Sequence, residues 1–393
     1  MTEPRAGALS RLPSLTGMRF IAAFLVFACH ASVLSYFTYA TEVHLIRFSY
    51  VAGWIGVEFF FVLSGFVLTW SVRDGERMQL FWRRRLVKIY PDYLVVWIAA
   101  VLLAVYAGKS LGIVSWDKDW IPSLFLVHTW YPNLTVILSN NAVTWTLGCE
   151  AFFYLLFPFL YRAIKRIPAN GLWWTVGAVT GVIALLPLIS KAFPGTPPMS
   201  APNISFPQEW FLAWFPLARC FDFVLGMLMA VIVKANRWPR FGIVPAFIVL
   251  AAGLTLQQYV FNSAWGLEAT IALPLALVIT AVGVADATGQ RSPFRARWLV
   301  WLGGISYAFY LVHFLVLAYG HVLIGINRTW PIPGAVAVLA GGLAASIVVA
   351  WLLTRLVEEP MMRRWARPRP QPGAVAATEP ARAATDSAPE SVS

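Results

Sequence analysis

The sequence predicts an all-α polytopic membrane protein with about ten transmembrane helices. Hydrophobic residues make up 59% of its 393 residues and charged residues only 12%, which is more apolar surface than a soluble core can bury. Apolar runs of about 20 residues, the helix length that spans the hydrocarbon layer, recur along the chain. The basic residues gather between alternate runs, as expected when cytoplasmic loops are positive.

The apolar runs give the order and bounds of the predicted spans. They cover residues 15–36, 51–72, 89–108, 143–162, 171–190, 211–233, 241–260, 265–285, 298–320 and 334–356. The longest outer segments, 109–142 and 191–210, are too short to hold a globular domain. Residues after 365 are rich in Pro, Ala and Ser and lack periodicity, which predicts a disordered cytoplasmic tail. We therefore expect a membrane domain over 1–365 and a tail over 366–393.

The distribution of Lys and Arg predicts the orientation. With the N-terminus in the cytoplasm, the cytoplasmic segments hold 24 of the 30 basic residues when Arg19 is counted with them, and the outer loops hold five. Only Arg219 remains, inside the sixth span. Both termini are therefore expected in the cytoplasm, and the net charge of +12 is explained by topology rather than by nucleic-acid binding. An Arg to Lys ratio of 24 to 6 and abundant Ala favour a GC-rich bacterial genome, hence the bacterial plasma membrane.

The first span carries two ionisable residues, Arg19 and His30. They are eleven positions apart, so they lie on one face of a helix, about 16 Å apart along its axis. Ionisable side chains inside a span are costly and commonly functional. The alternative is a snorkelling arginine near the inner boundary and a histidine bonded to a backbone carbonyl.

Further ionisable residues are expected at a similar depth in other spans. Counted from the outer end of each span at 1.5 Å per residue, four of them lie at about 9 to 10 Å, and two in the sixth span lie at about 12 and 17 Å. The first four are His30, Glu58, Glu150 and His313, and the last two are Arg219 and Asp222. Because each would be costly against lipid, we expect them to face one polar chamber. For Glu58, Arg219 and Asp222, a purely structural ion pair is the alternative.

Histidines and carboxylates in such a chamber suit proton transfer to or from a hydroxyl group. The same residue types also form proton paths in transporters and, less often, metal sites. The spacing contains no metal-ligand motif, so we expect no metal. Three cysteines, all within predicted spans, do not support a disulfide framework.

The densest basic run, residues 73–88, lies on the predicted cytoplasmic side. Its six basic residues, among them Arg84, Arg85 and Lys88, end against Tyr90 and Pro91. They fit ordinary retention of positive charge inside the cell, or a clamp for the phosphates of a nucleotide-bearing donor.

Seven stretches of the chain together resemble integral-membrane acyltransferase family 3, in the order that the family has them. They are LPSLTGMRFIAAFLVFACHA, GWIGVEFFFVLSGFVLTW, FWRRRLVKIYPDY, TWTLGCEAFFYLLFP, RCFDFVLGML, LGGISYAFYLVH and VEEPMMRR, and they span residues 12 to about 365. The resemblance implies O-acylation of surface sugars, lipid-linked oligosaccharides or macrolides, with acyl-CoA engaged from the cytoplasm as donor.

The resemblance also implies roles for individual residues. His30 matches the essential residue of the first span, as base or acyl carrier, with Arg19 on the donor side. Glu150 matches a family glutamate that would orient or complement the histidine. The family's arginine pair near the inner surface falls on Arg84 and Lys88, and the lysine there can hold a phosphate but lacks the bidentate fork.

Tyr307 and His313, in GGISYAFYLVH, are candidate pocket residues, with aromatic packing as the alternative. The esterase-like domain that often follows the last span in the family is not in this sequence, which favours small or lipid-linked acceptors over peptidoglycan.

The resulting hypothesis is a membrane O-acyltransferase that moves an acyl group, expected to be acetyl, from acyl-CoA to a sugar hydroxyl. His30 and Glu150 would be catalytic. The donor would be bound by Arg19, Arg84, Arg85 and Lys88. The alternative is a transporter of a lipid-linked sugar or small solute with a His/Glu proton path, and a third is a non-catalytic partner in polysaccharide assembly. The sequence does not specify the acceptor or the oligomeric state.

Overall fold

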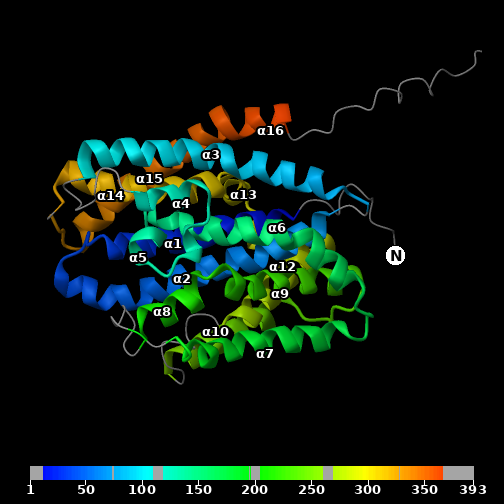
Figure 1. Ribbon diagram of the computed structural model, residues 1–393. Helices are drawn as coiled ribbons and strands as arrows, with labels where there is room; N and C mark the ends of the chain where they lie inside the picture. The colour runs from blue at the N-terminus through cyan, green and yellow to red at the C-terminus, as the bar shows by residue number, and fades with distance from the viewer. Residues whose placement is uncertain are drawn as a thin grey trace, which may run out of the picture.

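The computed structural model describes residues 12–72, 75–108, 118–193, 195, 204–259, 269–326 and 328–365. Over these residues the long regular elements are all helices (Figure 1), and an isolated β-bridge joins Phe37 to Trp330. The all-α prediction is confirmed. The predicted tail over 366–393 lies outside the described residues.

In the residues that the structure describes, ten long helices form the body of the protein, and each overlaps one predicted span. They are α1 (Pro13–Val33), α2 (Tyr39–Ser71), α3 (Met78–Ala107), α6 (Trp145–Lys165), α7 (Leu172–Ser190), α9 (Pro216–Lys234), α10 (Ile243–Tyr259), α12 (Ala272–Ala287), α14 (Ser306–Ile324) and α15 (Ile332–Leu353). In the described part of the chain, eight helical segments are long and apolar enough to cross a membrane, and α10 and α12 are shorter apolar helices. This arrangement confirms a polytopic membrane protein.

Short helices lie in the connections between the long ones. Those between α3 and α6 are η2 (Lys118–Trp120), α4 (Ile121–Leu124), η3 (His128–Trp130), α5 (Leu134–Ile137) and η4 (Ala142–Thr144), and the later ones are α8 (Phe206–Glu209), η5 (Trp210–Trp214), η6 (Pro293–Arg295), α13 (Arg297–Gly304), η7 (Thr354–Glu358) and α16 (Glu359–Trp365). The α3–α6 connection is tied to α3 at Ser123, whose carbonyl accepts from the Tyr93 hydroxyl and whose Oγ accepts from Trp97 Nε1 at 3.0 Å.

Contacts between helix ends show that the long helices alternate in direction. At one end, the Ser14 amide at the start of α1 donates to Asp286 at the end of α12 at 2.7 Å, and Lys234 at the end of α9 donates to the Thr69 carbonyl near the end of α2 at 2.6 Å. At the other end, the Tyr36 hydroxyl after α1 donates to the Leu317 carbonyl of α14 at 2.7 Å. We call the first the basic end, because Arg83, Arg84, Arg85 and Lys165 also lie there. That this end faces the cytoplasm stays a prediction.

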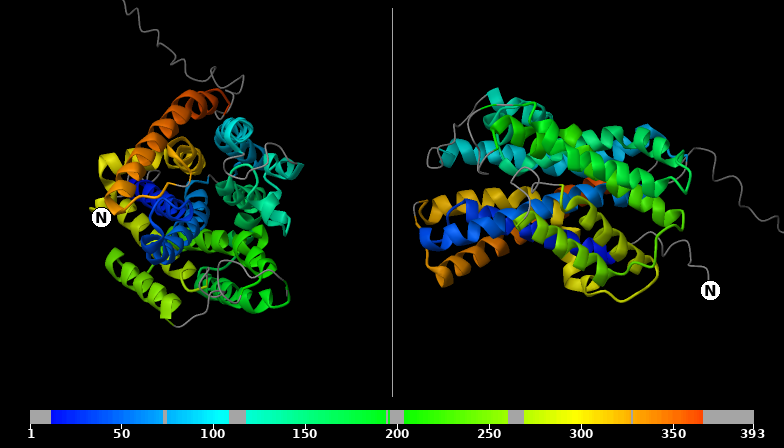
Figure 2. Two further views of the ribbon diagram at one scale, coloured as in Figure 1. Left: turned by 90° about the vertical axis from the view of Figure 1, so that its left-hand side faces the viewer. Right: turned by 90° about the horizontal axis from the view of Figure 1, so that it is seen from below.

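The centre of the bundle is formed by α1 and α2, which are surrounded by the other helices when the molecule is seen end-on (Figure 2). Two glycines let α2 and α9 cross closely. A Cβ at Gly65 would meet the Phe223 carbonyl oxygen, and one at Gly226 would meet the Val62 carbonyl oxygen. The crossing is therefore backbone against backbone, which fixes α2, the helix that contributes more residues than any other to the cavity described below.

The outer helices present apolar side chains outward. In the apolar stretch of the segment Ile332–Trp365, which contains α15, only 17% of the residues are buried, against 72% for Phe206–Lys234, which contains α9. An apolar helix with an exposed surface is stable when lipid is the solvent, so α15 has the character of a lipid-facing helix.

Several helix bounds differ from the predicted spans, each for a local reason. Helix α3 begins at Met78, so the basic residues 83–88 lie on its first turns instead of in a loop. The predicted span 211–233 is broken at Phe215, which is extended because it precedes Pro216. The predicted span 298–320 is broken after Gly304, where the Ser306 hydroxyl donates to the Gly303 carbonyl at 2.8 Å.

Replacing Gly226 with alanine is expected to destabilise the protein. The added methyl group must push α9 away from the Val62 carbonyl, and such overpacking costs about 1–3 kcal/mol. Gly177→Ala on α7 is the matched control, because open space surrounds that position and alanine is the better helix former. Thermal melting of detergent-solubilised protein should show a lower Tm for Gly226→Ala and an unchanged or higher Tm for Gly177→Ala. Equal melting temperatures would contradict the close crossing.

Candidate active site

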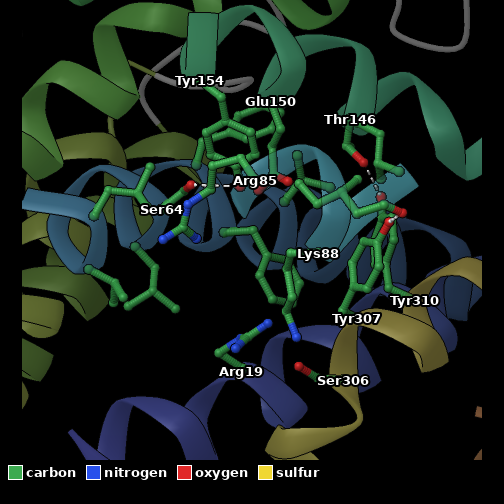
Figure 3. A pocket seen from close by; sticks show the side chains of 18 residues that line it. Arg19, Ser64, Arg85, Lys88, Thr146, Glu150, Tyr154, Ser306, Tyr307 and Tyr310 are labelled. Carbon is green, nitrogen blue, oxygen red and sulfur yellow. Dashed lines mark hydrogen bonds between the residues drawn. The ribbon is translucent and has the colours of Figure 1, made fainter. Parts of the chain in front are cut away.

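A cavity of about 160 Å³ opens between five helices and is the main candidate site in the described part of the chain (Figure 3). Its lining comes from α1, α2, α3, α6 and α14, and consists of Arg19, Val57, Phe60, Phe61, Leu63, Ser64, Val67, Leu68, Arg85, Lys88, Ile89, Thr146, Leu147, Glu150, Tyr154, Ser306, Tyr307 and Tyr310. Segments far apart in the sequence therefore meet at one space.

Helical periodicity explains why these residues share the cavity. Thr146, Glu150 and Tyr154 recur every four residues, so they form one face of α6. On α2 the lining positions run from Val57 to Leu68 at steps of three and four, and all but Ser64 are apolar. The same spacing could be read from the sequence, but which face of each helix turns inward could not.

Charged and polar side chains occupy one part of the wall. Arg19, Arg85 and Lys88 stand against a single carboxylate, Glu150, so the lining carries a net formal charge of +2. Glu150 is hydrogen-bonded to Tyr154 and faces Arg19 and Arg85. The Tyr154 hydroxyl in turn accepts from Ser64 Oγ at 3.3 Å. The cavity thus combines a cationic region with an apolar wall formed by α2.

The two lining tyrosines of α14 are held by hydrogen bonds to neighbouring helices. The Tyr307 hydroxyl donates to the Ile89 carbonyl of α3 at 2.8 Å. The Tyr310 hydroxyl lies 3.1 Å from Thr146 Oγ1 and 3.3 Å from the Val143 carbonyl (Figure 3). These bonds fix the two rings on the α14 side of the cavity.

His30 and His313 form a pair next to the cavity. His30 Nδ1 lies 2.9 Å from His313 Nε2, and the ring centroids are 5.1 Å apart. Neither histidine is among the lining residues, but the Tyr310 ring is, and its centroid lies 5.6 Å from that of His313. Tyr310 therefore adjoins both the cavity and the histidine pair.

Glu58, Arg219 and Asp222 form a second polar cluster, between α2 and α9. Arg219 Nη2 is bonded to Glu58 Oε2 and lies 3.3 Å from Asp222 Oδ2, and all three side chains are fully buried. The guanidinium also stacks 5.1 Å from the Phe61 ring centroid. None of the three lines the cavity, so the polar residues are distributed over separate clusters rather than around one chamber.

The residues of α3 that were predicted to bind the acyl donor differ in their surroundings. Arg85 and Lys88 line the cavity, whereas Arg84 does not and is paired with Glu76. Lys88 is paired with Glu358 of η7, and buried Asp92 lies beside both. The segment Val357–Pro360 is thus in contact with the basic turns of α3.

The structure also shows polar residues that the sequence did not single out. Tyr154, Ser64 and Tyr310 line the cavity; Tyr154 is one helical turn after Glu150 and Tyr310 is one turn before His313, a spacing that could have indicated both. His128 is fully buried in the α3–α6 connection, and neither ring nitrogen has a hydrogen-bond partner in the described structure. Burial lowers the pKa of His128 to about 4, so its ring is neutral at pH 7.

Comparisons with known proteins were made for the whole sequence. The model of an acyltransferase domain family matches residues 12–355. The chain belongs to acyltransferase family 3. This acyltransferase is 40% identical over 386 residues to acyltransferase MdmB of Streptomyces mycarofaciens, with 97% of each chain covered. No solved structure matches it.

A more distant relative is peptidoglycan O-acetyltransferase OatA of Listeria monocytogenes. It is 24% identical over 384 residues, which are 90% of this chain and 56% of OatA, so the chain spans about half the length of that relative. These findings confirm the predicted family and enzyme class. The protein is a polytopic membrane acyltransferase.

No group of three or more His, Cys, Asp or Glu residues that could hold a metal ion occurs in the part of the chain that the structure describes. The candidate site is accordingly built from cations, hydroxyl groups, one carboxylate and an imidazole pair.

Arg219→Met should unfold or strongly destabilise this acyltransferase. Removing the guanidinium leaves Glu58 and Asp222 buried without their cation, at a cost of about 3–5 kcal/mol. The triple variant Glu58→Leu, Arg219→Met, Asp222→Leu should melt at a higher temperature than the single variant, because replacing a whole buried ion cluster by apolar groups is often neutral. A stable, inactive single variant would instead indicate a role of Arg219 in the reaction.

Proposed function

We propose that this acyltransferase moves an acyl group, which we expect to be acetyl, from acyl-CoA to a hydroxyl group of a sugar-containing acceptor. The observation that carries the proposal is the cavity, in which Arg19, Arg85 and Lys88 from two helices converge beside an apolar wall. An acyl-CoA molecule matches the two parts of this cavity, because it has anionic phosphates at one end and an uncharged pantetheine and acyl chain at the other.

The cationic region would bind the phosphates of the donor. Guanidinium groups bind phosphate oxygens through charge-assisted, often bidentate hydrogen bonds. Arg85 is half-buried and its Nε lacks a partner in the described structure, so it has donors to offer a ligand. The basic end would face the cytoplasm, where acyl-CoA is found, with both termini on that side.

The apolar face of α2 would guide the uncharged part of the donor inward. Val57 and Leu68, the ends of this face, are eleven residues apart, or about 16 Å along the helix. Thr146 and Tyr310 lie at the far end, where the Tyr310 ring is in contact with His313 of the histidine pair. The thioester would thus be delivered toward His30.

His30 would act on the acceptor hydroxyl, and Glu150 would complement the donor region or His30. A neutral imidazole can take a hydroxyl proton at neutral pH. His30 is partly exposed while His313 is fully buried, so His30 is the accessible member of the pair. The relative OatA is a peptidoglycan O-acetyltransferase, which supports a sugar-bearing acceptor for this protein.

Two routes fit this arrangement. In the first, the acceptor oxygen attacks the thioester directly while His30 takes its proton. In the second, His30 accepts the acyl group before the acceptor arrives. Comparing glycolipids and secreted glycosylated metabolites by mass spectrometry, with and without the protein, would identify the acceptor. Unchanged acylation of every sugar-bearing compound would contradict the proposal.

Arg85→Ala is expected to weaken binding of acetyl-CoA about tenfold or more, because a charge-assisted contact to phosphate contributes about 1.5–3 kcal/mol. Binding of labelled acetyl-CoA to the solubilised protein would measure this loss. Arg83→Ala is the matched control, because Arg83 is exposed on the same helix. The effect should vanish for acetyl-pantetheine, which lacks the nucleotide phosphates, and an equal loss for both donors would refute a phosphate clamp.

His30→Ala should lower acyl transfer about 10²- to 10⁴-fold, the usual contribution of a general acid–base group. Exposed His44→Ala should leave it unchanged. Incubation with radiolabelled acetyl-CoA without acceptor separates the routes: covalent label in the wild type that disappears in His30→Ala supports the acyl carrier, and no label supports direct attack. Label that persists in His30→Ala would exclude His30 as the carrier.

A further inference from the structure

The hydrogen bonds around His313 determine which of its ring nitrogens carries a proton. His313 Nδ1 lies 2.7 Å from the Tyr310 carbonyl oxygen and 3.2 Å from that of Phe309. A carbonyl oxygen can only accept, so Nδ1 of His313 must be protonated. The other contacts of this buried ring are aromatic rings and His30, and an unpaired charge would be costly there, so the ring is neutral and Nε2 carries a lone pair.

The state of His313 in turn fixes the proton on His30. Because His313 Nε2 is an acceptor, the 2.9 Å contact to His30 requires His30 Nδ1 to donate. The His30 ring also interacts with the Val26 carbonyl one turn earlier on α1. The Val26 carbonyl oxygen can also only accept a hydrogen bond. Nδ1 is the ring nitrogen of His30 nearer the helix backbone, so the contact with Val26 likewise favours a proton on Nδ1.

We infer that His313 is a positioning residue, which holds the proton of His30 on Nδ1 and leaves Nε2 of His30 as the reactive atom. In a neutral imidazole with a proton on Nδ1, the lone pair is on Nε2, which points away from the hydrogen-bonded nitrogen and hence away from His313. This inference rests on the proposed function for the role of His30, and assigns His313 a role other than lining the substrate pocket.

The proton balance of the reaction follows from this tautomer. The acceptor O–H proton moves to His30 Nε2 as the acceptor oxygen bonds to the thioester carbonyl carbon. The carbon–sulfur bond then breaks, and the CoA thiolate takes a proton from Nε2, which restores neutral His30. While His30 is an imidazolium, its Nδ1–H still donates to His313 Nε2, so the charged ring keeps its partner. The acyl-carrier route would use the same Nε2 lone pair.

Nitrogen NMR of the full-length protein in lipid nanodiscs, labelled with ¹⁵N-histidine, tests the tautomer directly. The chain has five histidines, so the His30 signals can be assigned from the spectrum of His30→Ala. We expect Nδ1 of His30 to appear as a protonated nitrogen and Nε2 as an unprotonated one. The reverse pattern in the wild type would overturn the inference, whatever any variant does.

Two amide variants test the effect on the reaction. The amide oxygen of His313→Gln can reach the position of Nε2 and accept from His30, whereas the shorter side chain of His313→Asn reaches only the position of Nδ1. We expect His313→Gln to keep kcat within about tenfold of the wild type. His313→Asn should lose about 10²-fold or more in kcat with an unchanged KM for acetyl-CoA, and its His30 signals should become a mixture of tautomers.

Equal kcat losses in both variants, at equal melting temperatures, would overturn the positioning role. The tests remain distinguishable from those of the proposed function. If His30→Ala transferred acyl groups at the wild-type rate, the catalytic role of His30 would fail, while the NMR result would still report which nitrogen His313 leaves unprotonated.

Discussion

Everything in this bundle is subject to one constraint: a polar side chain surrounded by hydrocarbon must find a partner inside the protein. Arg219 meets it with two carboxylates, and His313 meets it with a backbone carbonyl and a second histidine. The cations of the cavity meet it differently. Arg19 and Arg85 share Glu150, Lys88 is paired with Glu358, and all three cations face an open space in which an anionic group can bind.

Helix α2 joins the structural and the functional parts of the molecule. Gly65 on one face of α2 lets the backbone of α9 come into contact with the backbone of α2. Glu58 of α2 is bonded to Arg219 of α9. Another face, from Val57 to Leu68, forms the apolar wall of the cavity. A shift of α2 against α9 would therefore displace the wall of the cavity, so the buried ion cluster supports the site without lining it.

The fold could be predicted from the sequence because lipid imposes both a length and a composition on each span, and every predicted span overlaps a helix. The interruption at Phe215 is caused by Pro216. An average of hydropathy over a whole span does not detect a single proline, so the break was not predicted. The site was harder. Depth along a helix placed His30, Glu58, Glu150 and His313 at one level, with Arg219 and Asp222 nearby, and predicted a single chamber. It carries no information on rotation about the helix axis, and the structure has separate clusters, with His30 against His313 and Glu58 against Arg219. Depth therefore could not separate Glu150, which faces the cavity, from Glu58, which faces α9.

The partner of His30 is a second histidine, His313, whereas Glu150 faces Arg19 and Arg85. The electrostatics of a buried site explain this arrangement. An ionised carboxylate next to the imidazole pair would need its own solvation, which a partly buried bundle interior supplies poorly. A neutral imidazole fixed by the Tyr310 carbonyl offers a single acceptor without adding a charge. Glu150 is instead held where its charge is compensated, between Arg19 and Arg85. The arrangement thus assigns charge to the end of the site where phosphates would bind, and neutral hydrogen bonding to the end where a proton would move.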